Sequence, residues 1–377
     1  MGPSHLSAAV LPLAVLLSAC ASPEPDAPAA TTDSTPILYF ANWDGEIGPT
    51  TLADFERETG IRVVVESLVD NVTLQTKLLA GGSGSDVVVP GSNFIGPLID
   101  AGALQPLDRR QLPNWRHLDP TILTSLDRID PGNRHGVPYV WGTQAFAYNV
   151  AAVRAALGAE PPPSWRLLFD PDYTRKLADC GIAWQDSAGS IMVDLALLAL
   201  GADPAGESLT DLAAAERTLR AVRGDVRYLD NSGRFQGDLA SGAICIATGA
   251  SGELAQARDL ARETGQGIDI RYVIPEEGAL TWIDLLVIPA DAPHPAAAHR
   301  FIDFLLRPEV IAAVTNASRY ANANRAALPL IHPSVRSDPA IYPDEASRAR
   351  LELVPAESAA YARERTRMWT RVRTARD

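Results

Sequence analysis

From residue 37 onward, short apolar runs rich in β-branched residues alternate with stretches of helical periodicity, and this alternation constrains the fold most. Runs such as residues 37–41 and 86–90 are apolar at successive positions rather than at every second one. That pattern is typical of strands buried on both faces of a parallel sheet, with helices between them. The chain is therefore predicted to have an α/β fold.

The first block of this pattern begins at residue 37. Its strands are expected at residues 37–41, 61–68 and 86–90, and its helices at residues 51–59 and 71–80. Gly60 and Gly81 follow the two helical stretches, and glycine commonly ends helices because it adopts left-handed backbone angles without strain.

A second block covers residues 143–268. Strands are expected there at 181–184, 226–229 and 243–248, and helices at 191–200, 209–222 and 251–264. Further strands are expected at 268–274 and 282–288, and helices at 295–314 and 346–372.

Two α/β blocks followed by additional strands predict two lobes completed by chain that crosses between them. The expected lobe 1 comprises residues 37–142 plus about 269–315, and lobe 2 comprises residues 143–268 plus about 316–377. In such folds the ligand cleft lies between the lobes, beyond the carboxyl ends of the strands.

The N-terminus has the pattern of an exported lipoprotein. Residues 6–19 are apolar, too short a stretch to span a bilayer, and end in Leu17-Ser18-Ala19-Cys20, which resembles a lipobox. Residues 1–19 are thus expected to be a signal peptide, and residues 20–36 a lipidated Cys20 followed by a flexible Pro- and Thr-rich tether. We expect a periplasmic protein that contacts the membrane only through this anchor.

Charge and cysteine content exclude several partners. The net charge of −13 gives no attraction to nucleic acid or to anionic membrane surfaces. Beyond Cys20 the chain contains Cys180 and Cys245, which in an exported protein form a disulfide or remain two buried thiols. Neither has a Cys or His at metal-ligand spacing, so we expect no metal and no cofactor.

Aromatic and acidic residues occur together after predicted strands. Trp43, Asp44 and Glu46 follow the first strand, where a core tryptophan beside surface acids is the alternative interpretation. Trp282 and Asp284 share one face of a later strand, and an unpaired carboxylate is costly on a dry face. Carboxylates and aromatic rings together bind alkylammonium groups by charge-assisted hydrogen bonds and cation–π contacts.

These residues lie within motifs that resemble a known family, the periplasmic putrescine- and spermidine-binding proteins of bacterial polyamine ABC transporters, especially their PotF-like branch. The resemblance spans nearly the whole chain from residue 37. It is carried by Asn42-Trp43, Phe55-Glu-Arg-Glu-Thr-Gly-Ile61, Lys77-Leu-Leu-Ala-Gly81, Asp86-Val-Val-Val-Pro90, Leu107-Asp108, Leu112-Pro-Asn-Trp115, Pro138-Tyr-Val-Trp141, Cys180-Gly181, Asp238-Leu-Ala-Ser-Gly-Ala-Ile-Cys245, Ile274-Pro-Glu-Glu-Gly278 and Tyr320-Ala-Asn-Ala-Asn324.

The resemblance implies a two-lobed periplasmic binding protein fold of type II-like topology that closes about a hinge. It also implies a Cys180–Cys245 disulfide, a polyamine ligand and ABC transporter permease subunits as partners. The ligand-binding residues that follow from it and from the acid and aromatic pattern are Trp43, Asp44, Glu46, Ser92, Asp186, Ser232, Glu253, Trp282, Asp284 and Tyr320.

The candidate site also departs from the family pattern. The family has a hydroxyl residue, an acid and an aromatic after the first tryptophan, where this chain has Asp44-Gly45-Glu46. A family tryptophan is replaced by Ala250, and a glutamate by Ser190. Because two aromatic walls are lost and acids are kept, we expect Glu46 to favour a longer or bulkier cation over putrescine.

Two other functions compete with polyamine transport. The chain has no Gly-x-Ser-x-Gly, His-Glu-x-x-His or Gly-x-x-x-x-Gly-Lys motif, so we expect no enzyme activity. The same fold could instead serve another amine or an amino-acid-like ligand, or a ligand-sensing role. A buried Arg or Lys at the site would favour a ligand carboxylate, whereas acids and aromatics alone favour a pure cation.

Overall fold

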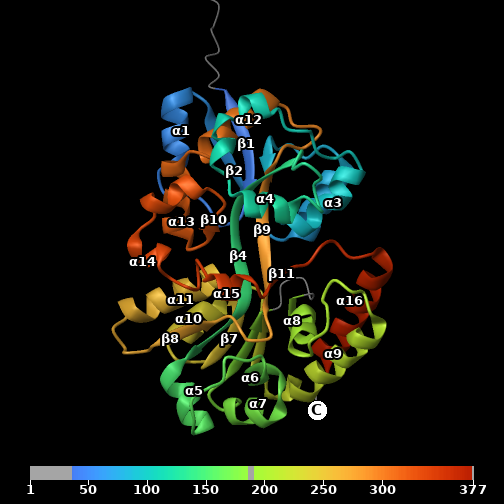
Figure 1. Ribbon diagram of the computed structural model, residues 1–377, viewed down its shortest axis with the longest axis vertical. Helices are drawn as coiled ribbons and strands as arrows, with labels where there is room; N and C mark the ends of the chain where they lie inside the picture. The colour runs from blue at the N-terminus through green and yellow to red at the C-terminus, as the bar shows by residue number, and fades with distance from the viewer. Residues whose placement is uncertain (1–35, 186–190, 376–377) are drawn as a thin grey trace, which may run out of the picture. The chain divides into compact units, whose positions relative to one another are not determined.

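The computed structural model describes residues 36–185 and 191–375 (Figure 1). The expected signal peptide and Cys20, as well as Asp186 and Ser190, lie outside the described residues. Within the described ranges, no helix combines the length and apolar character that a membrane span requires.

The strands of the described residues form one mixed sheet. They are β1 (Ile37–Asn42), β2 (Arg62–Ser67), β3 (Val87–Val88), β4 (Gly136–Asn149), β5 (Ile182–Gln185), β6 (Tyr228–Asp230), β7 (Ile246–Ala250), β8 (Ile270–Val273), β9 (Ala279–Val287), β10 (Ala321–Asn322) and β11 (Leu351–Leu353). Their order is β2-β1-β3-β9-β4-β7-β5-β6, while β8 and β10 also pair with β4, and β11 pairs with β9.

Helices alternate with these strands, which confirms the predicted α/β class. They are α1 (Thr51–Thr59), α2 (Asn71–Ala80), α3 (Ser92–Asp100), α4 (Pro120–Leu126), α5 (Val150–Leu157), α6 (Arg166–Phe169), α7 (Pro171–Leu177), α8 (Ile191–Ala199), α9 (Leu209–Val222), α10 (Arg234–Ala240), α11 (Ser251–Glu263), α12 (Pro295–Leu305), α13 (Pro308–Ser318), α14 (Pro333–Arg336), α15 (Glu345–Arg348) and α16 (Ala359–Thr374). Short 3-10 helices are η1 (Arg109–Gln111), η2 (Pro113–His117), η3 (Arg223–Asp225) and η4 (Arg325–Leu330).

The sheet is only partly the expected parallel one. Strands β1, β2 and β3 are parallel, and so are β5, β6 and β7, but β9 joins β3 in the antiparallel direction and β4 joins both β9 and β7 in the same way. Strand β2 lies at the edge of the sheet, and most of its side chains are exposed, including Val64 and Val65. Burial on both faces therefore does not hold for this edge.

Two large hydrophobic cores share strands β4 and β9. Val137 to Trp141 of β4 and Ile283 to Val287 of β9 belong to the first core, with side chains of β1, β3, α12 and α13. Ala145, Phe146 and Tyr148 of β4 belong to the second core, together with Leu280 of β9 and side chains of β5, α8, α9 and α16. A smaller cluster holds the apolar faces of α10 and α11 against β7. The chain thus crosses between the large cores on two paired strands.

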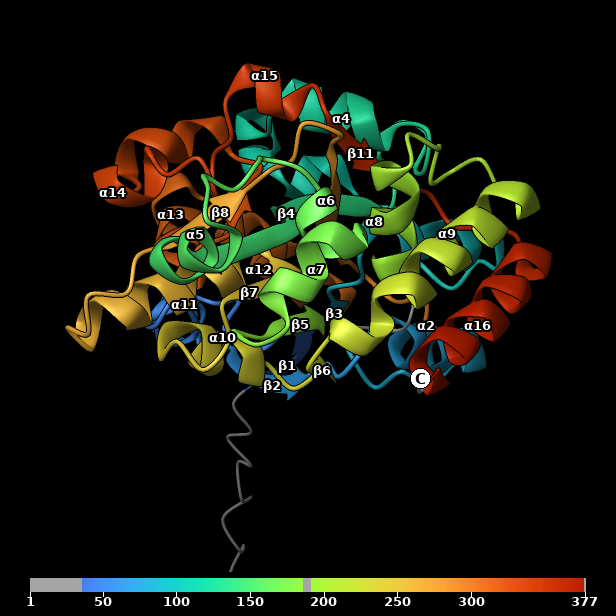
Figure 2. The ribbon, with the colours of Figure 1, turned by 90° about the horizontal axis from the view of Figure 1, so that it is seen from below.

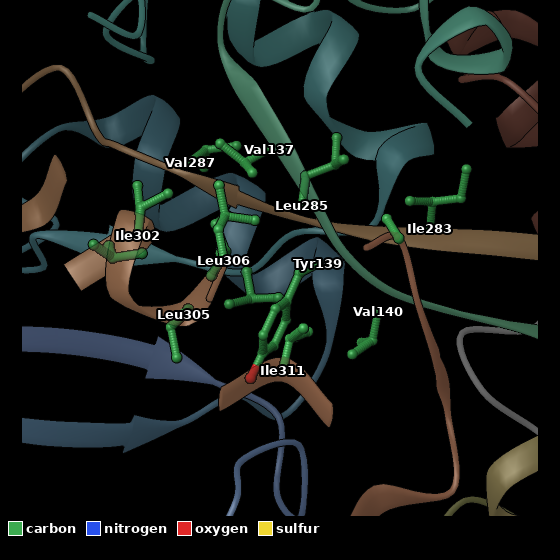
Figure 3. Packing of buried hydrophobic residues seen from close by; sticks show 14 of the residues in the cluster. Val137, Tyr139, Val140, Ile283, Leu285, Val287, Ile302, Leu305, Leu306 and Ile311 are labelled. Atoms are coloured by element: carbon green, nitrogen blue, oxygen red, sulfur yellow. The ribbon is translucent and has the colours of Figure 1, made fainter. Parts of the chain in front are cut away.

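Strand β9 contributes several side chains to the first core. Figure 3 shows Ile283, Leu285 and Val287 of β9 packed among the apolar side chains of this core, Ile302 and Leu305 of α12 included. Because alternate residues of a strand face opposite ways, Trp282 and Asp284 share the other face of β9 with Leu286, and the first core reaches that face too, since it includes Leu286 and packs against Trp282.

The C-terminal third differs from the expected helices. The helix expected at 295–314 is two helices, because Pro308 at the start of α13 interrupts the backbone hydrogen bonding after Leu306. The helix expected at 346–372 is α15, β11 and α16. Figures 1 and 2 both show α16 beside α9, where Arg371 pairs with Glu216 at 2.6 Å.

Residues of the expected lobe 2 are divided between the cores. Tyr320, Ala327 and Ile341 pack in the first core, whereas Tyr361 and Trp369 pack in the second. The structure thus places much of residues 316–341 with the segment expected to form lobe 1. The lobe boundaries themselves stay a prediction.

A disulfide joins Cys180 and Cys245, whose Cα atoms are 5.4 Å apart. Cys180 lies two residues before β5, and Cys245 lies just before β7 rather than within the strand expected at 243–248. These strands are parallel neighbours, with Ile182 opposite Ile246. The bond therefore ties the amino ends of two adjacent strands in the second core.

Candidate ligand-binding site

Glu46 is brought inside the protein by a tight turn after β1. Gly45, with φ 79°, allows the chain to reverse. The backbone carbonyl of Glu46 then accepts hydrogen bonds from Asn42 Nδ2 at 2.9 Å and from the Tyr139 hydroxyl at 2.7 Å. The Glu46 side chain is only 5 % exposed, and its Oε2 has no hydrogen-bond partner among the described residues.

Asp284 is a second buried acid, on β9. It is 6 % exposed and forms an isolated antiparallel bridge with Gly91, the residue before α3. Burial raises the pKa of the Asp284 carboxyl to about 8, and no donor or cation among the described residues offsets that rise. The carboxylate is therefore costly to ionise without a partner.

Glu253 is a third acid, in the first turn of α11. Its Oε2 accepts hydrogen bonds from Gln185 Nε2 at 2.9 Å and from the backbone N–H of Ala250 at 3.2 Å. Gln185 in turn accepts a hydrogen bond from Gln144 on β4. Burial still raises the pKa of Glu253, with a smaller contribution from Asp230. Glu253 is thus held in place by donors that the other two acids lack.

Aromatic rings pack beside the acids. The rings of Trp282 and Tyr320 meet edge to face, with centroids 4.9 Å apart. The indole N–H of Trp43 donates a hydrogen bond to the Val89 carbonyl oxygen at 2.9 Å, and this bond fixes the orientation of the ring. Such rings attract cations over their faces and exclude water.

Electrostatic repulsion shows that the three acids and Tyr320 share one region. Burial raises the pKa of Glu46 well above its ordinary value, and repulsion from Asp284 and Glu253 raises it further. Burial also raises the pKa of the Tyr320 hydroxyl, with contributions from all three acids. The side chains predicted at 46, 253, 284 and 320 are therefore brought together.

Of the other residues predicted to bind the ligand, two are exposed at the surface and one is buried at the start of a helix. Asp44 is exposed and accepts a hydrogen bond from Ser67 Oγ at 2.5 Å. Ser232 is exposed and donates from Oγ to Asp230 at 2.6 Å. Ser92 is buried at the first position of α3, directly after the residue that bridges to Asp284.

Two tyrosines that contact the candidate site were not predicted from the sequence. The Tyr139 hydroxyl anchors the Glu46 backbone, and the Tyr272 hydroxyl lies 2.7 Å from Thr143 Oγ1 on β4. Tyr272 belongs to the group of charges and hydroxyls that act on Tyr320. Tyr139 lies within a motif that carries the family resemblance, but only the folded chain shows that it contacts the carbonyl of Glu46.

This arrangement suits a positively charged ligand. Buried carboxylates without a cation raise the free energy of the unliganded site, and an ammonium group would supply both charge and hydrogen-bond donors. Within the described ranges, no group of His, Cys, Asp and Glu is arranged to hold a metal ion.

Comparisons with known proteins agree with this chemistry. Residues 50–343 match the family of bacterial extracellular solute-binding proteins. The chain is 40 % identical over 339 residues to the putrescine-binding periplasmic protein SpuD of Pseudomonas aeruginosa (strain UCBPP-PA14), covering 90 % of this chain and 92 % of that protein. It is 39 % identical over 339 residues to the putrescine-binding periplasmic protein PotF of Escherichia coli (strain K12), covering 89 % and 91 %.

A solved structure has the same fold. The spermidine/putrescine ABC transporter substrate-binding protein PotD of Streptococcus pneumoniae matches with a TM-score of 0.76 at 26 % identity, over 89 % of this chain and 98 % of that one. The family match, the similar proteins and the solved structure each cover most of the chain, and all three indicate the same kind of protein. The chain belongs to the bacterial extracellular solute-binding proteins.

Proposed function

We propose that this protein is the substrate-binding subunit of an ABC importer and that it captures a polyamine between its two lobes. The observation that supports this most is the group of buried acids, Glu46, Asp284 and Glu253, beside the rings of Trp282 and Tyr320. The similar proteins named for putrescine and spermidine binding support the same ligand class.

The charge balance favours a pure cation over an amino acid. Among the described residues classed as buried, Arg365 is the only Lys or Arg, and it pairs with Asp194 at 2.5 Å on α8. No Lys or Arg contributes to the pKa shifts of Glu46, Asp284 or Tyr320. A ligand carboxylate would therefore meet like charge at this site, whereas ammonium groups would meet opposite charge.

The same acids explain how a ligand would favour closure. Residues adjacent in sequence to Glu46 and Asp284 pack in the first core. Glu253 instead lies on α11, whose apolar face packs against β7 in a different cluster. Bringing these acids together without a cation is opposed by repulsion and desolvation. A polyamine that contacts all of them stabilises the closed arrangement more than the open one, and the closed form is the one delivered to the permease.

A ligand panel tests the function. Isothermal titration calorimetry with putrescine, cadaverine, spermidine and agmatine should show saturable binding, while glycine, glutamate and 4-aminobutyrate should give none. Tight binding of an amino acid with no response to any polyamine would refute the proposal. Mass spectrometry of the amine after incubation should return it unchanged, as expected for a binding protein rather than an enzyme.

Membrane anchoring through Cys20 is a separate part of the proposal. It is supported by the apolar segment and the Leu17-Ser18-Ala19-Cys20 motif. The variant Cys20→Ser should move the protein from the membrane fraction to the soluble periplasmic fraction of the host cell. An unchanged membrane fraction would contradict lipid anchoring at this residue.

A further inference from the structure

Strand β2 forms an open edge of the sheet. It pairs in parallel with β1, no other strand of the described residues lies beyond it, and Figure 2 shows it at the margin of the ribbon. All of its residues except Val63 are exposed, with Val64 at 38 % and Val65 at 43 %. The open edge of a strand is a template on which another strand can pair.

This edge lacks the features that usually protect such strands. Natural edge strands are commonly interrupted by proline, by lysine or by a bulge. Strand β2 instead has three valines in succession, residues 63–65, and its register with β1 is regular along its whole length. Tyr39 of β1, which lies opposite Val64, adds a further exposed ring. The edge is therefore suited to contact with another chain.

The backbone of β2 directs alternate hydrogen-bonding groups away from the sheet. The N–H groups of Arg62 and Leu68 donate hydrogen bonds of 2.8 and 2.9 Å to carbonyl oxygens on the β1 side, so even-numbered residues of β2 face β1. Because successive residues of a strand turn their N–H and C=O groups to opposite sides, those of Val63 and Val65 point to the open edge. These two residues can therefore bond to a further strand.

The sequence of this edge is complementary to itself. In an antiparallel pair of two β2 strands centred on Val64, Val63 of one copy lies opposite Val65 of the other. Both residues have outward N–H and C=O groups, so each such pair exchanges two hydrogen bonds. The valine that is exposed in one copy would then be covered by the second.

The same register pairs opposite charges. Arg62 of each copy lies opposite Glu66 of the other, at positions that flank the hydrogen-bonded pairs and where side chains approach most closely. A pair centred on Val63 or Val65 instead would lose both of these charge pairs. Charge complementarity thus selects one register and one kind of partner, a second copy of this chain.

Arg62 and Glu66 are accessible to such a partner. Arg62 is exposed, and no ion pair holds it within the part of the chain that the structure describes. Glu66 contacts Lys77 Nζ of α2 at 2.8 Å, but its side chain is 55 % exposed, so its carboxylate can accept from an arginine as well. Lys77 therefore orients the carboxylate without covering it.

We propose that β2 is a self-association surface, through which two copies of this chain pair antiparallel about Val64 and join their sheets. This inference does not depend on the identity of the ligand. Because the contact is a single strand pair with a few adjoining side chains, the dimer is weak and depends on protein concentration.

Sedimentation equilibrium over a range of concentrations measures the dissociation constant of the dimer. All samples carry Cys20→Ser, so that a lipid group cannot itself bring copies together. Val65→Lys should weaken the dimer at least about tenfold, because a lysine on an edge strand opposes pairing. The control is Leu260→Lys on α11, which changes an apolar side chain of similar exposure, 42 %, and should leave the dimer unchanged.

A charge exchange tests the register. Arg62→Glu alone brings like charges opposite one another, as does Glu66→Lys alone, so each should weaken self-association at least about tenfold. In an equal mixture the two variants have opposite charges at both pairs and should form a mixed dimer within about threefold of the unaltered affinity. Loss of folding in a variant cannot imitate this recovery.

Amide hydrogen exchange followed by NMR locates the contact. The amides of Val63 and Val65 should exchange more slowly as the dimer forms, whereas that of Val64, which faces β1, should not change. A monomer at every concentration, a dimer that Val65→Lys leaves intact, or variants that associate no better together than alone would each overturn the proposal.

Discussion

Trp282 and Tyr320 meet edge to face with their ring centroids 4.9 Å apart, and each ring also lies directly on a glycine. An ideal Cβ on Gly142 would be 2.6 Å from Cζ2 of Trp282, and one on Gly252 would be 2.4 Å from Cε1 of Tyr320. Both distances are far shorter than a normal van der Waals contact. The aromatic pair therefore depends on two positions where the chain has no side chain.

The first prediction concerns Gly252→Ala. The added methyl group must displace the Tyr320 ring, so spermidine affinity in calorimetry should fall by at least about tenfold, or about 1.4 kcal/mol. The matched control is Gly237→Ala in α10, where no atom lies within 4 Å of the new Cβ. That change should leave affinity unaltered and stabilise the protein by about 0.5–1 kcal/mol, as alanine does in helices. Normal affinity of Gly252→Ala would show that the ring does not contact the ligand.

A second prediction concerns Asp284→Asn. Removing one charge of a buried pair with a ligand ammonium should weaken polyamine binding by about 2–5 kcal/mol, well over tenfold. The exposed Asp44→Asn is the control and should bind as the unaltered protein does. Calorimetry with putrescine and spermidine measures both, and equal affinities of the two variants would remove Asp284 from the site.

The third prediction is a pH dependence with a defined sign. The pKa of Asp284 is about 8 in the folded protein and ordinarily 3.8, so between these values the folded state holds a proton that the unfolded chain has released. The contribution of Asp284 to the stability of the ligand-free protein should therefore be greatest at low pH and should fall as pH rises from about 4 towards 8. Chemical unfolding at several pH values should show this fall as the difference between the unaltered protein and Asp284→Asn.

Ligand binding should reverse that protonation. A bound ammonium stabilises the ionised carboxylates, so polyamine binding near pH 7 should release protons. Calorimetry in buffers of different ionisation enthalpy detects this as a buffer-dependent heat. Identical heats in all buffers would mean that Asp284 and Glu46 are already ionised before the ligand arrives.

The fourth prediction concerns the disulfide. Its cysteines are separated by 65 residues, and loop-closure entropy for a loop of that length gives about 4 kcal/mol of stabilisation. Replacing Cys180 and Cys245 by serine should lower the free energy of unfolding in urea by about that amount. Polyamine affinity of the folded variant should change by less than about threefold, because Gln185 and Ala250, which hold Glu253, lie at the opposite ends of β5 and β7. A large loss of affinity would mean that the bond also shapes the site.

Many helix boundaries could be predicted because the residues that begin and end a helix lie within it or next to it in the sequence. Helices α1 and α9 begin and end at the predicted residues, and α2 begins where the Asp70 side chain caps it. Strand β4 was missed, although it extends over 14 buried residues. Its Pro138 and Gly142 are unfavourable in isolated strands, and only pairing on both sides with β9 and β7 makes this segment extended.

The acids and rings of the site could be predicted from strand alternation and family motifs, but their partners could not. That Gln185 satisfies Glu253 while Glu46 Oε2 stays unpaired depends on contacts between segments far apart in sequence. Likewise, Asp44 and Glu46 are two residues apart, and only the turn at Gly45 places one outside and the other inside.

The crossing of β4 and β9 between the two large cores has one more consequence. Gly142 and Thr143 remain paired with Trp282 and Thr281 where the strands leave one core and enter the other. A rotation of one core against the other would twist this pair of strands beside Trp282. A molecule bound against the indole would then contact the crossing itself and would oppose that twist without any intervening residue.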